Sequence, residues 1–128
     1  MKKFLAVLVF AVSLFGFELD KTYSCETLGL SFKENNKTYN ILNNKESEKQ
    51  LKQSLKDLYF IKIKPLKKQM EVYVGDKNDT LDFVKTLNKK VNLYKTKTSD
   101  LFILTDPKTS QIGISIPSQK MIIYYQCK

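Results

Sequence analysis

Two cysteines, Cys25 and Cys127, constrain the fold of this chain more than any other feature of its sequence. They are 102 positions apart, and Cys127 is the second residue from the end. An isolated pair of cysteines in an oxidising compartment usually forms a disulfide. A redox-active thiol is disfavoured, because the chain has no C-x-x-C motif and no histidine that could lower a thiol pKa. The sequence therefore predicts a structural disulfide that ties the first strand to the last.

The N-terminal segment predicts an oxidising compartment. Two lysines follow the initial methionine, and an uncharged, largely apolar run then extends from Phe4 to Phe15. This is the layout of a secretory signal peptide, and the run is shorter than the roughly 20 residues of a membrane-spanning helix. Gly16 is the best small residue before a cleavage site, which predicts a signal peptide over 1–16 and one mature domain over 17–128. Cleavage after Ser13 and an uncleaved anchor are the alternatives. We expect a periplasmic or secreted protein with no transmembrane segment after cleavage.

The charge of the chain is strongly positive, and all of its 22 basic residues are lysine, against 13 acidic residues. Without Lys2 and Lys3 the net charge falls from +9 to +7. Arginine, which binds phosphate and guanine through two parallel hydrogen bonds, is absent. Together with export, this excludes a nucleic-acid partner. The lysines are explained either by an AT-rich genome or by a basic surface that attracts an anionic envelope component, such as lipid head groups or phosphorylated polysaccharide.

Alternation of apolar and polar residues predicts about seven short strands. In the first segment, Tyr23 and Cys25 alternate in one phase and Leu30 and Phe32 in the other, so a bulge near Gly29 would turn both sets, and Leu28 with them, toward the core. In the last segment Met121, Ile123 and Tyr125 share a face with Cys127, which supports the disulfide. The segments with this alternation include 22–32, 38–42, 59–64, 70–74, 91–95, 101–105, 112–116 and 121–127.

One helix is predicted over 46–58, where Leu51, Leu55 and Leu58 fall on one face and Asn44 is a suitable N-cap. Residues 80–90 are compatible with a strand, but the spacing of their apolar residues slightly favours a second helix, capped by Asp79. Short turns between strands favour antiparallel pairing. We therefore expect an α+β fold, an antiparallel β-sheet of about seven short strands with one or two helices packed on it. The alternative is a small closed β-barrel with one helix.

The residue types required for catalysis are largely missing. Without histidine there is no Ser-His or Cys-His pair and no histidine metal ligand. The acidic and amide residues at 76, 78 and 79 lack the closing glutamate of a calcium loop, and they are better explained by a turn. We expect no catalytic residue, no metal and no cofactor, and hence a protein that is not an enzyme. A hydrolase that uses two carboxylates is the least favoured possibility.

Aromatic residues predict a binding face. Four strands carry an aromatic side chain opposite their aliphatic residues, and lysines flank them. Alternatively, the helix over 46–58 covers this face and the aromatics belong to the core. The residues of the predicted face are Tyr73, Tyr94, Phe102, Tyr124, Lys62, Lys64 and Lys95.

These features favour a small exported, non-catalytic binding or interaction protein of a bacterial-type cell envelope. Its expected partner is an anionic envelope component or an envelope protein, and we expect a monomer. An inhibitor of an extracellular enzyme is the alternative, because the stretch 22–26 and the terminal cysteine resemble those of small periplasmic lysozyme inhibitors. The chain lacks the Ser-Gly-x-x-Tyr loop of that family, however, and its positive charge would repel a basic lysozyme.

Overall fold

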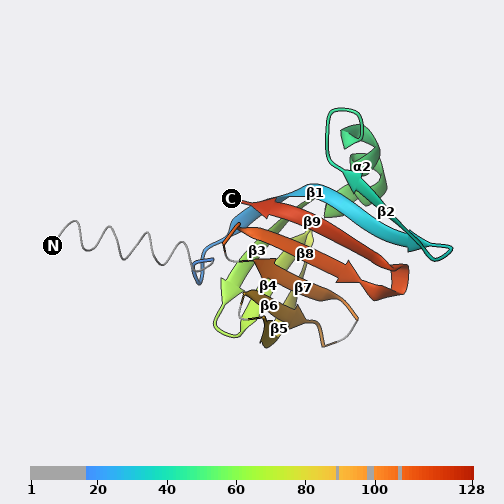
Figure 1. Ribbon diagram of the computed structural model, residues 1–128. Helices are drawn as coiled ribbons and strands as arrows, with labels where there is room; N and C mark the ends of the chain where they lie inside the picture. Colours follow the sequence, from blue (N-terminus) through green and yellow to red (C-terminus); the bar gives the residue numbers. More distant parts are fainter. Residues whose placement is uncertain (1–16, 89, 98–99, 107) are drawn as a thin grey trace.

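The computed structural model describes residues 17–128 except 89, 98–99 and 107, so the predicted signal peptide over 1–16 lies outside the described residues. Within the described part, nine strands and one short α-helix follow one another along the chain (Figure 1). Their bounds are β1 Tyr23–Glu34, β2 Lys37–Leu42, α2 Glu48–Leu55, β3 Phe60–Leu66, β4 Gln69–Val74, β5 Lys77–Leu87, β6 Val91–Lys95, β7 Phe102–Asp106, β8 Gln111–Ile116 and β9 Met121–Cys127. The chain also contains two short 3₁₀ helices, η1 Lys56–Leu58 and η2 Pro117–Gln119.

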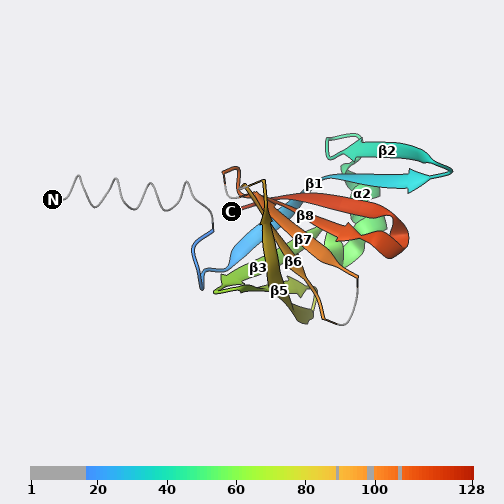
Figure 2. The same ribbon diagram turned by 60° about the horizontal axis from the view of Figure 1, so that its bottom comes forward.

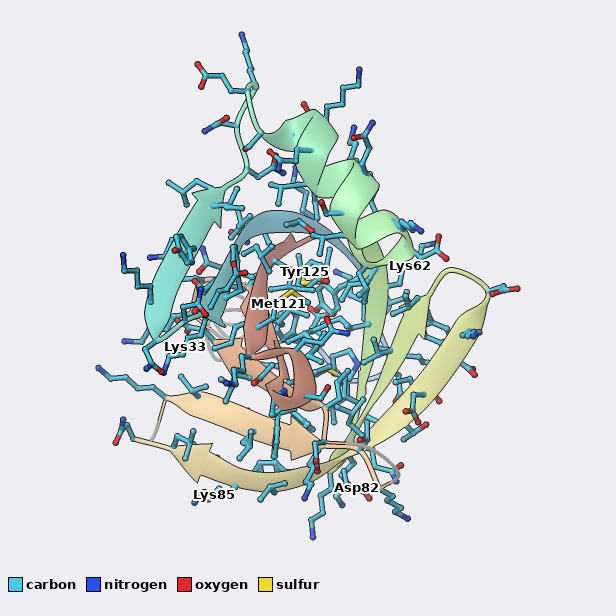
Figure 3. The ribbon with its side chains drawn as sticks, turned by 90° about the vertical axis from the view of Figure 1, so that its right-hand side faces the viewer. Lys33, Lys62, Asp82, Lys85, Met121 and Tyr125 are labelled. Carbon is cyan, nitrogen blue, oxygen red and sulfur yellow. A yellow bond between two sulfur atoms is a disulfide. The ribbon has the colours of Figure 1, made fainter. Side chains whose placement is uncertain are left out.

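The sheet closes on itself. Its order is β2-β1-β3-β4-β5-β6-β7-β8-β9, every pair is antiparallel, and β1 also pairs with β9. The ring β1 and β3–β9 is therefore a closed barrel of eight strands, while β2 lies outside it and pairs with β1 (Figure 3). The principal prediction, a sheet of about seven strands with helices packed on it, is wrong. The alternative, a small barrel with one helix, is what the structure shows.

The disulfide lies at the seam of the barrel. Cys25 and Cys127 are partners in the β1–β9 register, and their sulfur atoms are bonded at 2.06 Å. Both side chains are buried in the core. The predicted disulfide is confirmed, and the first and last strands that it joins are the pair whose contact closes the ring.

A bulge in β1 allows this strand to pair with three others, β2, β3 and β9. Its register with β9 shifts between Thr27 and Gly29; before the shift β1 pairs with β3, and after it with β2. At Gly29 an added Cβ would lie 2.8 Å from the backbone oxygen of Ile41, so close pairing with β2 requires glycine there. The predicted bulge is confirmed: Tyr23, Cys25 and Leu30 are buried in the core, and Phe32 is partly buried against it. Leu28 is the extra residue of the bulge and remains 36% exposed, so its predicted place in the core is wrong.

Residues 80–90, predicted slightly in favour of a helix, belong largely to strand β5. This strand pairs with both β4 and β6, and its register with β6 shifts between Phe83 and Lys85. Val84 is the extra residue of this bulge. It separates the apolar residues Leu81, Val84 and Leu87 by three positions instead of the two of a regular strand, and a spacing of three is also typical of a helix. Asp79 caps no helix; it pairs with Val72 in the sheet.

Side chains fill the barrel. Ile63, Leu81, Ile103, Ile123 and Tyr125 have no exposed surface, and Figure 3 shows side chains crowded inside the ring around Tyr125. An eight-stranded barrel is just wide enough for its inward side chains to pack against one another. The hydroxyl of Tyr125 donates a 2.6 Å hydrogen bond to the carbonyl of Leu58, so this buried phenol has a hydrogen-bond partner.

The helix α2 follows β2 and packs at one end of the barrel, and the β1–β2 hairpin extends beyond the ring beside it (Figure 2). Its Leu51 and Leu55 are buried in the core, as their spacing predicted. The side chain of Asn44 accepts hydrogen bonds from the backbone amides of Glu46 and Ser47, so it caps the turn that precedes α2. Among the described residues, no helix has the length and apolar character needed to cross a lipid bilayer.

Candidate functional site

Closure of the barrel distributes the seven residues of the predicted binding face over several strands. Tyr94 faces the interior: it pairs with the buried Ile103 and is only 9% exposed, and burial raises the pKa of its phenol. The sequence placed Tyr94 on an exposed binding face, whereas the structure places it in the core. The prediction took Leu93 as the core residue of β6, whereas the structure shows the opposite phase, with Leu93 half-buried and outward. A five-residue strand with apolar side chains on both faces does not reveal its phase from its own sequence.

The other six residues point outward, on two parts of the wall. Lys62 and Tyr73 are partners across β3 and β4, and Lys64 lies two residues farther along β3, opposite Glu71. Lys95 and Phe102 are partners across β6 and β7, where the Lys95 Nζ atom lies 5.5 Å from the centre of the Phe102 ring. Tyr124 lies on β9, 43% exposed. These residues do not form one continuous strip.

A groove of about 800 Å³ brings Lys62 and Tyr73 together with residues that the sequence did not single out. It lies on the outer wall, where β1 leaves β3 to pair with β2. Figure 3 shows Lys62 on β3 close to α2, at this part of the wall. The groove is lined by Ser24, Cys25, Glu26, Thr27, Leu28, Asn43, Phe60, Ile61, Lys62, Tyr73, Gly75, Gln126 and Lys128.

Two lysines flank a serine in this groove. Ser24 is the register partner of Lys62 on β3, and it exchanges two backbone hydrogen bonds, of 3.1 and 2.9 Å, with Lys128. The three residues thus occupy neighbouring positions on three adjacent strands, β3, β1 and the end of β9. Among the described residues, the side chains of these three have no hydrogen bond or ion pair within the protein. Ammonium and hydroxyl groups in this state are available to an anionic ligand.

Two apolar side chains, Phe60 and Leu28, also line the groove. Phe60 is the register partner of Glu26, and its ring is 56% exposed. The ring is held from one side by Tyr59, with ring centres 4.7 Å apart in an edge-to-face arrangement. Leu28, displaced outward by the bulge, adds a second exposed apolar side chain. Sequence reasoning missed Phe60, although its alternation with Ile61 places it on the same face as Lys62.

The polar groups at the floor of the groove are satisfied within the protein. The Nδ2 atom of Asn43 donates to the carbonyl of Thr27 and to the hydroxyl of Tyr59, both at 2.6 Å. Gln126 is held as well, because its Nε2 atom donates to the carbonyl of Thr109 at 2.8 Å. The floor is therefore fixed by hydrogen bonds before any ligand arrives, and fixed side chains lose little entropy on binding.

The charges that line the groove are mixed, with Lys62 and Lys128 against Glu26. Beside the groove, Lys52 lies 6.0 Å from the centre of the Phe60 ring and forms an ion pair with Glu48, whose hydrogen bond and charge raise the pKa of Lys52. Tyr73 donates a hydrogen bond to Glu71, which raises the pKa of the Tyr73 phenol. Among the described residues, no three His, Cys, Asp or Glu side chains gather where they could hold a metal ion.

Comparison with known proteins adds no relative: no family model, no curated protein and no solved structure matches this chain.

Proposed function

We propose that this chain is an exported, non-catalytic binding protein of a bacterial-type cell envelope, periplasmic or secreted, and that the groove beside β1 holds its ligand. The observation that carries the proposal is the exposed Phe60 ring beside two lysines that form no ion pair with any residue the structure describes, on a floor that is already hydrogen-bonded. The ligand that suits this arrangement is an anionic envelope component with an apolar part. Its anionic group would lie between Lys62 and Lys128, and its apolar part on Phe60 and Leu28.

Inhibition of an extracellular enzyme has less support. An inhibitor acts through a segment that protrudes into its target, and the loop over 106–111 is the polar segment suited to that role. The carbonyls of Thr109 and Ser110 accept hydrogen bonds from Gln126, so this part of the loop is tied to β9. The groove therefore remains the better supported site.

Ligand binding can be tested by titrating the exported, oxidised protein with a short-chain phosphatidylglycerol, kept below its micelle concentration. We expect the backbone amides of β1, β3 and the end of β9 to shift in the NMR spectrum, and the matching phosphatidylcholine to bind at least 10-fold more weakly. The double variant Lys62→Gln/Lys128→Gln should weaken binding about 10-fold, which corresponds to about 1.4 kcal/mol. Lys64→Gln, on the same strand but outside the groove, is the matched control. A soluble phosphorylated polysaccharide fragment serves as the second anionic probe; if neither probe shifts the groove amides, the proposed site is wrong.

Export is tested separately. We expect the protein in the periplasmic or secreted fraction, with an N-terminus at Phe17 and no thiol that can be alkylated before reduction. A chain that keeps residues 1–16 and two free thiols would contradict the proposed localisation.

A further inference from the structure

The wall formed by β6–β9 is nearly free of charge. Lys95 and Asp106 are the only charged residues in these four strands, whose residues the structure describes in full, and each is the last residue of its strand. In the chain as a whole 27% of the residues are charged, and β3–β5 on the other side of the barrel carry both lysines and acids. Charge is therefore distributed unevenly around the barrel, and β6–β9 carry only these two charged residues.

Apolar side chains cover this uncharged wall. The registers align Leu93, Leu104, Gly113 and Tyr124 in one row across β6–β9, and Lys95, Phe102, Ser115 and Ile122 in the next. We call the outward apolar residues Leu93, Phe102, Leu104, Ile122 and Tyr124 the β6–β9 patch. Tyr124 is 43% exposed and the other four are half-buried. An exposed apolar patch of adjoining side chains on a protein surface usually marks an interaction site.

The middle strand of the patch contributes only small residues. On β8, the outward positions between the two rows of larger side chains are Gly113 and Ser115. The Tyr124 ring lies beside Gly113, where an added Cβ would come within 3.8 Å of it. Gly113 is buried, because the side chains of Ile122 and Tyr124 reach over it, so larger apolar side chains of the neighbouring strands form the outer surface of the wall here.

We propose that the β6–β9 patch is a self-association surface on which a second copy of this chain packs face to face. An anionic lipid surface or an acidic protein would be attracted to the lysine-bearing walls and not to this one. Two copies of the exported chain, each with net charge +7 without Lys2 and Lys3, repel each other wherever their lysines meet, and on this wall Lys95 and Asp106 are the only charged residues that the strands would bring to the contact. A two-fold arrangement brings the same patch together on both copies.

The size of the patch sets the expected affinity. Four strands about 4.8 Å apart, each with about five residues at 3.3 Å, cover roughly 300 Å² of flat wall. Stable interfaces bury about 800 Å² on each partner. We therefore expect a weak dimer that forms only at high concentration. The groove is lined from β1, β3, β4 and the end of β9 and by none of the patch residues, so the inference is independent of the proposed function.

Sedimentation equilibrium of the exported, oxidised protein between about 10 µM and 1 mM tests the proposal. We expect monomers at the low end and a substantial dimer fraction at the high end. Leu104→Lys and Tyr124→Lys, at the centre of the patch, should each weaken association at least 10-fold. The matched control is Leu42→Lys on β2, where the side chain is 73% exposed and outside the patch, and it should leave association unchanged.

A second measurement locates the contact. The amides of β6–β9 should shift in the NMR spectrum as the concentration of the wild-type protein rises, and in Leu104→Lys they should not. Unchanged far-ultraviolet circular dichroism of each variant shows that it is folded. A wild-type protein that stays monomeric at 1 mM, or an equal loss of association in Leu42→Lys, overturns the proposal. So does broadening of the patch amides by phosphatidylglycerol vesicles while the protein remains a monomer, because the occupant would then be a lipid surface.

Discussion

At the scale of single residues, Gly29 and Gly113 differ in what surrounds them, although both lie on strands of one barrel. An added Cβ at Gly29 would lie 2.8 Å from the backbone oxygen of Ile41, and a strand backbone cannot move aside cheaply. At Gly113 the nearest atoms are side-chain carbons at 3.7 and 3.8 Å, an ordinary contact. We predict that Gly29→Ala lowers the free energy of unfolding by about 1–3 kcal/mol and Gly113→Ala by less than about 0.5 kcal/mol. Urea denaturation measures both, and equal effects would contradict the close approach of the β2 backbone to Gly29.

Tyr125 predicts how stability depends on alkaline pH. Its side chain has no exposed surface, and burial raises its phenol pKa far above the usual value of about 10. The unfolded chain releases this proton near pH 10 while the folded chain retains it, so the contribution of Tyr125 is complete below pH 10 and is lost as the pH rises further. We predict that the free energy of unfolding falls more steeply between pH 9.5 and 11 in the wild type than in Tyr125→Phe. Parallel pH profiles of the two proteins would exclude this role.

Single residues of the predicted binding face could be placed from the sequence only in part. Phe102 and Tyr124 were correctly placed opposite the aliphatic residues of their strands, because Ile103 and Ile123 fix the inward phase there. Tyr94 was misplaced, because the neighbouring Leu93 is also apolar and was taken as the inward residue, whereas Tyr94 itself turns inward. The groove could not be foreseen, since it depends on the point where β1 leaves β3, and that point is set by pairing between strands distant in sequence.

At the scale of elements, β5 shows why local periodicity gave the wrong structure. Leu81, Val84 and Leu87 have the spacing of a helix, but the residues on either side of Val84 pair with β6 in two different registers. A bulge inserts one residue and shifts the phase, so a bulged strand and a helix can have the same apolar pattern over ten residues. The helix predicted over 46–58 exists but is shorter: α2 covers Glu48–Leu55, where Leu51 and Leu55 repeat at four residues with polar side chains between them, and Leu58 lies in the following turn η1.

Helix α2 makes a prediction of its own at this scale. Leu51 is 1% exposed and belongs to the same core as the barrel interior, whereas Gln53 on the same helix is exposed. We predict that Leu51→Ala costs about 2–5 kcal/mol, because it removes buried carbon atoms and leaves a cavity. Gln53→Ala should change the free energy of unfolding by less than about 0.5 kcal/mol. If the two variants unfold at the same urea concentration, α2 does not contribute to the core of the barrel.

At the scale of the whole molecule, the sequence indicated that the sheet could close into a barrel, but it did not decide between a barrel and an open sheet. A disulfide between Cys25 and Cys127 brings the first and last strands together, and a sheet whose terminal strands meet is a barrel. The alternation of apolar residues along each strand is the same in an open sheet and in a barrel, since both have one buried face. The cysteines were therefore a stronger guide to topology than the strands, and the open sheet was the wrong choice between the two.

The disulfide at the seam gives the last prediction. Because it closes a loop of 102 positions, its loss allows the unfolded chain many more conformations, and the chain-entropy model assigns about 4–5 kcal/mol to a loop of this length. The variant Cys25→Ala/Cys127→Ala should lose up to that amount of unfolding free energy in urea. Native-state hydrogen exchange should show where the loss falls. The amides that join β1 to β9 should exchange faster by a larger factor than those that join β4 to β5, because only the former pair loses its covalent link. A uniform acceleration over both pairs would mean that the bond stabilises the fold without holding the seam.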